Sequence, residues 1–389
     1  MLLPIRGVEA ADNAVAPAFK PRLPSKSVAG KGCIVEQGRI PAALRVWFAQ
    51  QQRALPWRVA NAQGMRDPYR TWIAEIMLQQ TRVEAVIPYF ENFLRVFPDA
   101  QTFALAAEVD VLRAWSGLGY YRRARMLHAA AALLMEKYQG TFPPTAAALR
   151  ALPGIGAYTA AAIASLAFGE RIAVVDGNVK RVVARLFAWE LAADDKQLEL
   201  AARQQGAVWM ATLPLDELAA AGQLNEAMME LGATVCLPRN PLCDVCPLRE
   251  NCLARQAGRA AQLPLPKKAK KWVDLEMVFL VHRVGERVLL AQREGGWSPG
   301  LFEPPSILLA QQSPAQAALD LQGLATQSAA ALQDHGVVRH TITHHRIRAF
   351  VYSLVATTER PTTSGAQWLD PASVPLTGLA SKVLRCTFA

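Results

Sequence analysis

The stretch LPGIGAYTAAAIA, residues 152–164, places a proline and two glycines directly before an alanine-rich run. Residues 145–151 have helical spacing, so the pattern predicts a helix, a tight turn and a second helix. Gly154 and Gly156 allow left-handed backbone and close approach of another molecule. Amides at the start of the second helix can then bind an anion such as a DNA phosphate. An ordinary helix–helix turn with a glycine C-cap fits equally well, so the turn alone leaves both interpretations open.

The length of 389 residues predicts two domains, and a hydrophobic content of 52% is enough for sizeable cores. The net charge of +10 favours a polyanionic partner such as nucleic acid, although many soluble proteins are merely basic. The apolar run at 157–168 is too short to span a membrane, so we expect no membrane association. Residues 1–38 contain no continuous apolar segment like that of a secretory signal, and we expect a disordered extension.

Helical spacing dominates residues 39–255, and β-rich runs such as LEMVFLVHR and RIRAFVYSLVA dominate residues 273–389. Between them, residues 256–272 include LPLPKKAKKW, whose prolines and lysines predict a basic linker. The pattern therefore predicts an all-α domain followed by a smaller α+β domain. The expected helices are 42–52, 68–80, 111–116, 122–138, 145–151, 157–168, 179–188 and, in the second domain, 314–324.

Four of the six cysteines, Cys236, Cys243, Cys246 and Cys252, have the spacing C-x6-C-x2-C-x5-C. Such a cluster predicts metal binding in a reducing cytoplasm rather than disulfides. Four thiolates suit one 4Fe–4S cluster, and the single C-x-x-C pair does not fit a zinc ribbon, although zinc stays an alternative. Arg239, in the first loop between cysteines, is expected to face a phosphate or to be solvated.

Two further motifs accompany the hairpin and the cysteines. VVDGNVKRV, residues 174–182, brings Asp176 and Asn178 to the start of a helix, where Asp176 can cap the helix and present a carboxylate to a cleft. Together, seven stretches resemble the iron–sulfur DNA glycosylases of the helix-hairpin-helix superfamily, and most closely the MutY-type adenine DNA glycosylases. They are LPWR (55–58), AEIMLQQTRV (74–83), GLGYYRRAR (117–125), LPGIGAYTA (152–160), VVDGNVKRV (174–182), NEAMMELGA (225–233) and the four cysteines.

The resemblance implies an all-α glycosylase domain with a helix-hairpin-helix motif at about 145–168 and one 4Fe–4S cluster at 236–252. It implies two helical lobes with double-stranded DNA crossing between them. Its substrate would be adenine mispaired with 8-oxoguanine or guanine, extruded from the helix before its N-glycosidic bond is hydrolysed. We also expect a monomer that acts in the cytoplasm at a bacterial nucleoid.

The resemblance also implies the catalytic residues. Glu75 would be the general acid that protonates adenine N7, and burial on an apolar helix would raise its pKa; the alternative is an exposed surface glutamate. Asp176 would stabilise the sugar cation by charge or by transient covalent attachment, with Asn178 orienting Asp176 or the water. Tyr158 occupies the place of the lysine that forms a Schiff base in endonuclease III-type enzymes. A phenol cannot do so, which predicts a glycosylase without efficient lyase activity.

Other residues are expected to bind DNA. Trp57, Arg58 and Glu226 match positions that hold the extruded adenine. Gln80 and Tyr120 match residues that enter the duplex, with Tyr121 as the alternative to Tyr120. Three arginines are expected either at phosphates or on a solvated face: Arg122, Arg123 and Arg125.

The second domain resembles the Nudix-like C-terminal domain of the same family. GGWSPGLFEPP, at 295–305, is typical of such folds, but residues 306–326 contain a single acid, Asp320. A Nudix hydrolase needs several glutamates for Mg²⁺, so we expect a recognition module without pyrophosphohydrolase activity. In RHTITHH (339–345), Thr343 and His344 align with the loop that reads 8-oxoguanine, and Ile342 replaces the usual phenylalanine.

Two alternative functions fit parts of the sequence. One is an endonuclease III-like bifunctional glycosylase and AP lyase, which Tyr158 and the additional domain oppose. The other is a non-catalytic, metal-dependent DNA-binding protein, which Glu75, Asp176 and Asn178 oppose.

Overall fold

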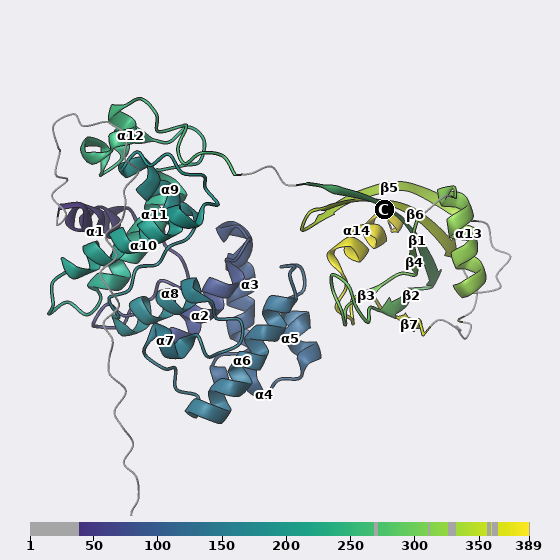
Figure 1. The fold of residues 1–389 in the computed structure, drawn as a ribbon. Coiled ribbons are helices and arrows are strands. Elements are labelled where there is room, and N and C mark those ends of the chain that lie inside the picture. The colour runs from purple at the N-terminus through teal and green to yellow at the C-terminus, as the bar shows by residue number, and fades with distance from the viewer. Residues whose placement is uncertain are drawn as a thin grey trace, which may run out of the picture. The chain divides into compact units, whose positions relative to one another are not determined.

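The computed structural model describes residues 39–267, 271–309, 312–325, 332–355, 359 and 365–388 (Figure 1). The expected disordered extension, residues 1–38, lies outside this described part. Among the described residues, none of the helices combines the length and the apolar character that crossing a membrane requires.

The N-terminal part of the described chain is helical, as expected for the first domain. Figure 1 shows α2–α8 on one side and α1 with α9–α12 on the other. Helix α2 packs against α8, α8 packs against α11, and α11 packs against α1 and α9. The helices are α1 (Arg39–Gln51), α2 (Pro68–Met77), α3 (Val83–Val96), α4 (Ala100–Leu105), α5 (Glu108–Ala114), α6 (Arg122–Tyr138), α7 (Ala146–Leu149), α8 (Ala157–Phe168), α9 (Gly177–Leu186), α10 (Lys196–Ala211), α11 (Ala220–Thr234) and α12 (Leu253–Gln256), with 3₁₀ turns η1 (Cys243–Val245) and η2 (Arg249–Asn251).

The helix expected over 68–80 ends early, at Met77. Asp67 caps its start by accepting a hydrogen bond from the amide of Arg70 at 2.8 Å, and Pro68 follows at the first helical position. Its far end gives way to a loop in which Gln80 has a φ of 61°. Left-handed backbone cannot continue a right-handed helix, so this residue is part of a loop and not of α2.

The hairpin between α7 and α8 has the predicted form, with one difference. Gly154 has a φ of 76°, and a Cβ added there would lie 3.0 Å from Cβ of Met126. Gly156 instead has extended backbone, with φ of −80° and ψ of 175°, so only Gly154 uses the left-handed conformation. No side chain caps the start of α8, and Gly156 is exposed. The first amides of α8 therefore face solvent, where an anion could bind them.

The C-terminal part is a seven-stranded sheet with one helix on each face, which confirms the α+β prediction. Strands β3-β2-β1-β6-β5 run in this order, β4 pairs with β1, β7 pairs with β2, and β1 and β6 are parallel. The elements are β1 (Val273–Val284), β2 (Arg287–Gln292), β3 (Phe302–Glu303), β4 (Ser306–Leu308), α13 (Pro314–Ala325), β5 (Gln333–Ile342), β6 (His345–Val355), β7 (Gln367–Leu369) and α14 (Gly378–Thr387).

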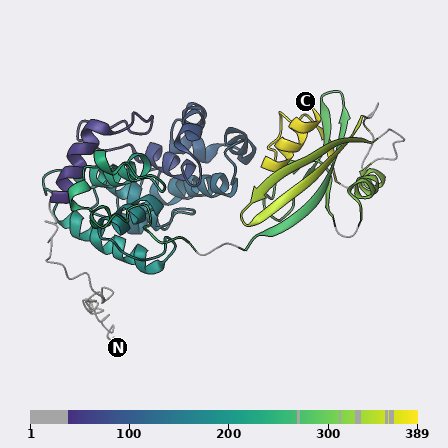
Figure 2. The ribbon, with the colours of Figure 1, turned by 90° about the horizontal axis from the view of Figure 1, so that it is seen from above.

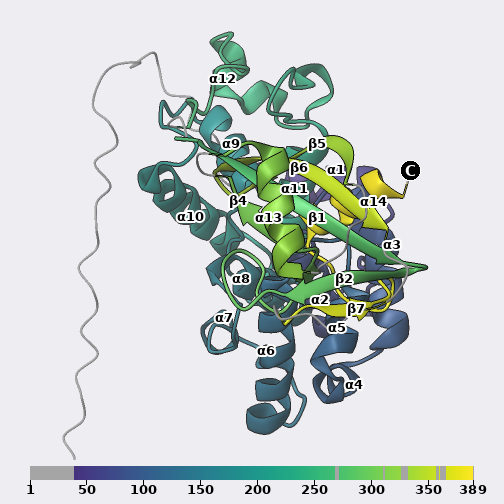
Figure 3. The same cartoon turned by 90° about the vertical axis from the view of Figure 1, so that its right-hand side faces the viewer.

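Strand β1 is buried on both faces because its side chains alternate between two helices. Met277, Phe279 and Val281 belong to the core beneath α14, which also contains Leu379, Val383 and Leu384. Val278 and Leu280 belong to the other core, with Ala317 and Leu321 of α13. Figures 2 and 3 show α13 and α14 on opposite faces of the sheet.

Candidate active site

A cavity of about 270 Å³ lies among α2, α8, α9, α11 and the loop that precedes α2. Its lining contains side chains up to 177 residues apart that contact one another directly, so the tertiary fold and not local sequence assembles it. The structure brings together seven of the predicted site residues here: Trp57, Arg58, Glu75, Tyr158, Asp176, Asn178 and Glu226.

Glu75 is buried in this cavity, with 9% of its surface exposed, as the resemblance predicts and against the exposed alternative. Its Oε2 atom has no hydrogen-bond partner within the described residues. Burial raises the pKa of Glu75 to about 7, and the negative charges of Asp176 and Glu226 add to the rise, while the nearby Tyr158 hydroxyl and the positive charge of Arg58 oppose it. A carboxyl with this pKa is substantially protonated near neutral pH, so Glu75 can serve as a general acid.

Asp176 caps helix α9 and lines the cavity at the same time. Its Oδ1 accepts the amide of Val179 at 2.7 Å, and its Oδ2 accepts Nδ2 of Asn178 at 3.1 Å. Burial raises the pKa of Asp176, and the hydrogen bonds from Val179 and Asn178 oppose that rise by favouring the charged form. The same contacts hold the carboxylate in one orientation at the cavity wall.

Arg181, which we did not single out in the sequence, connects this carboxylate to the cysteine loop. Its Nη2 donates to Oδ1 of Asn178 at 2.9 Å and to the carbonyl of Gly232 at 2.8 Å. Its Nε donates to the carbonyl of Cys236 at 2.8 Å. The only sequence signal was its position three residues after Asn178, which places both on one face of a helix.

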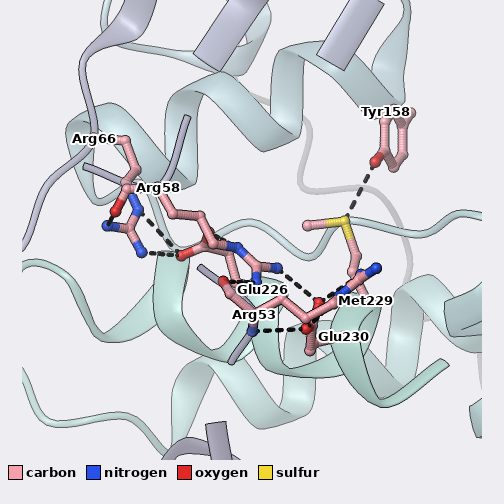
Figure 4. A network of polar contacts seen from close by, with 7 residues as sticks. All are labelled: Arg53, Arg58, Arg66, Tyr158, Glu226, Met229 and Glu230. Atoms are coloured by element: carbon pink, nitrogen blue, oxygen red, sulfur yellow. Dashed lines mark hydrogen bonds and ion pairs between the residues drawn. The ribbon is translucent and has the colours of Figure 1, made fainter. Parts of the chain in front are cut away.

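A network of arginines and glutamates lines the same cavity (Figure 4). Glu226 and Glu230 lie one turn apart on α11, and Arg58 donates to both, at 3.2 Å and 2.9 Å. Arg53 binds Glu230 through Nε at 2.8 Å and Nη2 at 2.9 Å, while Arg66 binds Glu226 at 2.8 Å. Sequence reasoning missed Arg53, Arg66 and Glu230. The signal that could have found them is the pair of acids at i and i+4 on one helix, whose mutual repulsion is relieved by nearby cations.

The network fixes the ionisation of Glu230. Burial alone would raise its pKa, but hydrogen bonds from Arg53 and Arg58 outweigh burial and lower the pKa to about 2. Glu230 is therefore charged while Glu75, in the same cavity, is held near its neutral form. Opposite shifts of neighbouring carboxyl groups are typical of sites that separate acid and anion roles.

Tyr158 projects into the cavity from the first turn of α8. Its hydroxyl donates to Sδ of Met229 at 3.3 Å (Figure 4). Burial and the nearby Glu75 and Asp176 raise its pKa well above the usual value for a phenol, so it stays neutral. The described residues that line the cavity include no lysine. An amine nucleophile is therefore missing from this wall.

Gln80 and Tyr120 do not line the cavity but lie exposed on two loops, with φ values of 61° and 50°. Between them, Arg123 contradicts our expectation of a phosphate contact or a solvated face. Its guanidinium points inward and donates to backbone carbonyls, among them those of Ile76, Gln79 and Leu118. Arg125 is also not merely solvated, because its Nε donates to Glu108 at 2.8 Å. Arg122 is exposed, and its role at phosphate remains a prediction.

Thr343 and His344 form the exposed turn between β5 and β6 in the second domain. Thr343 has a φ of 55°, a left-handed conformation typical of a tight turn. Oγ1 of Thr343 lies 3.4 Å from Nδ1 of His344. Both side chains can therefore meet a ligand without rearrangement of the sheet.

The four cysteines line one small cavity of about 30 Å³, together with Arg185, Arg249 and Arg255. Arg185 is 2% exposed, and its Nη1 lies 3.3 Å from Sγ of Cys236. Four sulfur donors and three cations suit an anionic thiolate cluster. Within the described residues, no group of three or more His, Cys, Asp or Glu side chains is arranged to hold a metal ion.

Three family descriptions match the chain. Residues 73–206 match the HhH-GPD superfamily base excision DNA repair protein, residues 236–252 the iron-sulfur binding domain of endonuclease III, and residues 277–386 the NUDIX domain. These matches confirm the predicted fold class and, with the four-cysteine cavity, the predicted 4Fe–4S cluster.

Curated relatives extend the comparison over most of the chain. The adenine DNA glycosylase of Homo sapiens is 34% identical over 86% of this chain and 71% of its own length. That of Rattus norvegicus is 35% identical over 83% of this chain and 72% of its own length. That of Mycolicibacterium smegmatis is 40% identical over 56% of this chain and 70% of its own length.

Proposed function

The chain belongs to the adenine DNA glycosylase family, and on that premise we propose that the cavity at Glu75 receives an adenine extruded from double-stranded DNA. The chain is a monofunctional glycosylase of base excision repair. Its proposed substrate is adenine opposite 8-oxoguanine or guanine. The observation that carries this proposal is the pairing of a buried, near-neutral Glu75 with an anchored Asp176 in one cavity.

The two carboxyl groups divide the chemistry of N-glycosidic cleavage. Glu75, protonated, transfers its proton to N7 of adenine as the bond to C1′ breaks, so the base leaves as a neutral molecule. Asp176, ionised, faces the oxocarbenium-like sugar, and water supplies the hydroxyl that completes hydrolysis. Asn178 holds the Asp176 carboxylate through its 3.1 Å hydrogen bond. Tyr158 provides a neutral wall that cannot form a Schiff base.

Three other residues of the cavity lining recognise the base. Trp57 offers an aromatic surface that is itself fixed edge-on against Phe90, at 5.3 Å between ring centroids. Arg58 and Glu226 offer a donor and an acceptor to the polar edge of adenine. Their mutual ion pair means that neither charge is left uncompensated when the cavity is empty.

Other surfaces hold the DNA. Gln80 and Tyr120 enter the duplex beside the extruded base, and the amides after Gly154 and Gly156 bind a backbone phosphate. Thr343 and His344 contact the 8-oxoguanine opposite the adenine. The enzyme acts as a monomer, since one chain contains all of these elements, and works in the cytoplasm at a bacterial nucleoid.

Single-turnover adenine release tests the proposal. Duplexes carrying adenine opposite 8-oxoguanine, guanine or thymine are incubated with excess protein and quenched with and without alkali. We expect release from the first two duplexes and strand breaks only after alkali. Breaks without alkali would instead support a bifunctional lyase, and absence of release from every duplex would leave a DNA-binding protein with a cluster.

A further inference from the structure

Two exposed loops of the helical domain each present one non-glycine residue in left-handed backbone. Gln80 has a φ of 61° in the loop after α2, and Tyr120 has a φ of 50° in the loop before α6. Neither is glycine, so both conformations are intrinsically unfavourable and persist only where surrounding contacts impose them.

The guanidinium of Arg123 lies between these loops. Its Nη1 lies 2.8 Å, 3.0 Å and 2.6 Å from the carbonyl oxygens of Ile76, Met77 and Gln79. Its Nη2 lies 3.3 Å from the carbonyl oxygens of both Leu118 and Gly119, and 3.3 Å from Oγ1 of Thr81. One side chain thus contacts the residues on either side of Gln80 and the two residues directly before Tyr120.

Aromatic contacts strengthen the same junction. The guanidinium carbon of Arg123 lies 5.4 Å from the ring centroid of Trp115 and 5.5 Å from that of Tyr120. Trp115 also donates through Nε1 to the carbonyl of Gly119 at 3.1 Å. Tyr120 is therefore held both through its ring and through the backbone before it.

Arginine suits this position better than any other side chain. The last turn of α2 leaves carbonyl groups without helical partners, and a cation at that end also interacts favourably with the helix dipole. The planar fork of guanidinium donors can serve two acceptor groups on different sides at once, whereas the ammonium of lysine is a single point. Burial lowers the pKa of Arg123 to about 10, so it remains charged at neutral pH.

We infer that Arg123 is a positioning residue that joins the two loops into one rigid wedge, so that Gln80 and Tyr120 enter the duplex together. The inference rests on the proposed function, in which those two residues insert. In this role Arg123 positions the two loops and contacts neither the DNA phosphates nor the reacting atoms.

The experiment uses the full chain with Arg123→Met and Arg123→Lys. The matched control is Arg171→Met, because Arg171 likewise donates to backbone carbonyls, those of Met210 and Leu213, at 3.3 Å and 3.1 Å. Base extrusion is followed by the fluorescence of 2-aminopurine placed opposite 8-oxoguanine. Adenine release is measured under single-turnover conditions on the same duplex with adenine, and on a duplex in which mismatches on both sides have already opened the helix.

We expect Arg123→Met to lose the fluorescence rise and to slow adenine release from the closed duplex by about tenfold to a hundredfold. Release from the opened duplex, and the pH dependence of its rate, should match the wild type. Arg123→Lys should fall between the two, since lysine can serve only one set of carbonyls. Arg171→Met should lower thermal stability without changing the ratio of the two rates.

Several results would overturn the inference. A normal fluorescence rise with Arg123→Met would show that the wedge forms without it. Equal slowing on both duplexes, or a shifted pH profile, would mean that Arg123 acts through overall stability or through Glu75. Gln80→Ala and Tyr120→Ala distinguish failure of the wedge from failure of the role of Arg123. If neither variant reduces base extrusion, the proposed wedge itself is refuted. If they reduce extrusion while Arg123→Met leaves it unchanged, only the role of Arg123 is refuted.

Discussion

Replacing Glu75 with glutamine should stabilise the protein above neutral pH, because the buried carboxylate is costly there. The folded-state pKa of Glu75 is about 7, against an ordinary value of 4.5. Between these values the folded protein binds more protons than the unfolded chain, so this group lowers the free energy of unfolding as pH rises. Below pH 4.5 the cost vanishes, because both states are protonated.

The size of the effect follows from the same two values. At about 1.4 kcal/mol per pH unit, the cost of ionised Glu75 is about 1 kcal/mol at pH 5 and about 3 kcal/mol at pH 8. Glutamine keeps the shape of the side chain but cannot ionise. Any other effect of the substitution on stability is the same at pH 5 and at pH 8, so it cancels when the two are compared. The stability gained by Glu75→Gln should therefore increase by about 2 kcal/mol between pH 5 and pH 8.

Urea unfolding of the wild type and Glu75→Gln at pH 5, 6, 7 and 8 measures this difference directly. Glu91→Gln is the control, since Glu91 is an exposed glutamate on the neighbouring helix α3, and its effect should stay within about 0.5 kcal/mol at every pH. The same Glu75→Gln protein should release no adenine. A stability difference that does not change between pH 5 and pH 8 would refute the raised pKa and with it the assignment of Glu75 as a neutral acid.

Four further predictions concern the same cavity. Adenine release should slow as pH rises through about 7, where Glu75 loses its proton, and a rate that keeps rising to pH 9 would contradict the acid role. Asp176→Asn should reduce the single-turnover rate by about 10²-fold or more without weakening DNA binding. Tyr158→Lys should form a Schiff base with the sugar, which borohydride converts into a stable covalent complex between protein and DNA. If borohydride yields no such complex, Tyr158 does not face the sugar. Glu230→Gln should destabilise the protein by about 3 kcal/mol, because it removes the charged partner of Arg53 and one of the two charged partners of the buried Arg58. It should raise KM more than it lowers kcat; unchanged chemical denaturation would show that the network is not coupled to folding.

The parts of the site that sequence predicts best are those whose contacts are local. Asp176 accepts from the amide three residues later, so its capping role and its place at a helix start are written in VVDGNVKRV. Gly154 and the helix that follows are similarly determined within a few residues. The burial of Glu75 was not local information, since it depends on how α2 packs between other elements, and there the family resemblance supplied what helical spacing could not.

The residues that sequence reasoning missed or misassigned all act over long separations. Glu230 pairs with Arg53, 177 residues away, and composition gives no hint of which of 42 basic residues will meet which acid. Arg181 reaches the carbonyl of Cys236 across 55 residues. Such pairs form because the fold brings them together, so they become visible only once the helices are packed.

Arg122 and Arg123 show the same limit within one motif. They are adjacent, chemically identical and about 100° apart around α6, yet one is exposed while the other turns inward to carbonyls up to 47 residues away. Hydrophobic periodicity treats both as polar and predicts two solvated cations. What distinguishes them lies in another part of the fold. Carbonyl groups at the end of α2, beside the left-handed Gln80, lack helical donors, and of the two arginines only Arg123 is placed to supply them. To predict which arginine is buried, one should therefore identify the last carbonyl groups of each neighbouring helix and the side chains that can donate hydrogen bonds to them. The polarity pattern of the arginine's own helix is less informative.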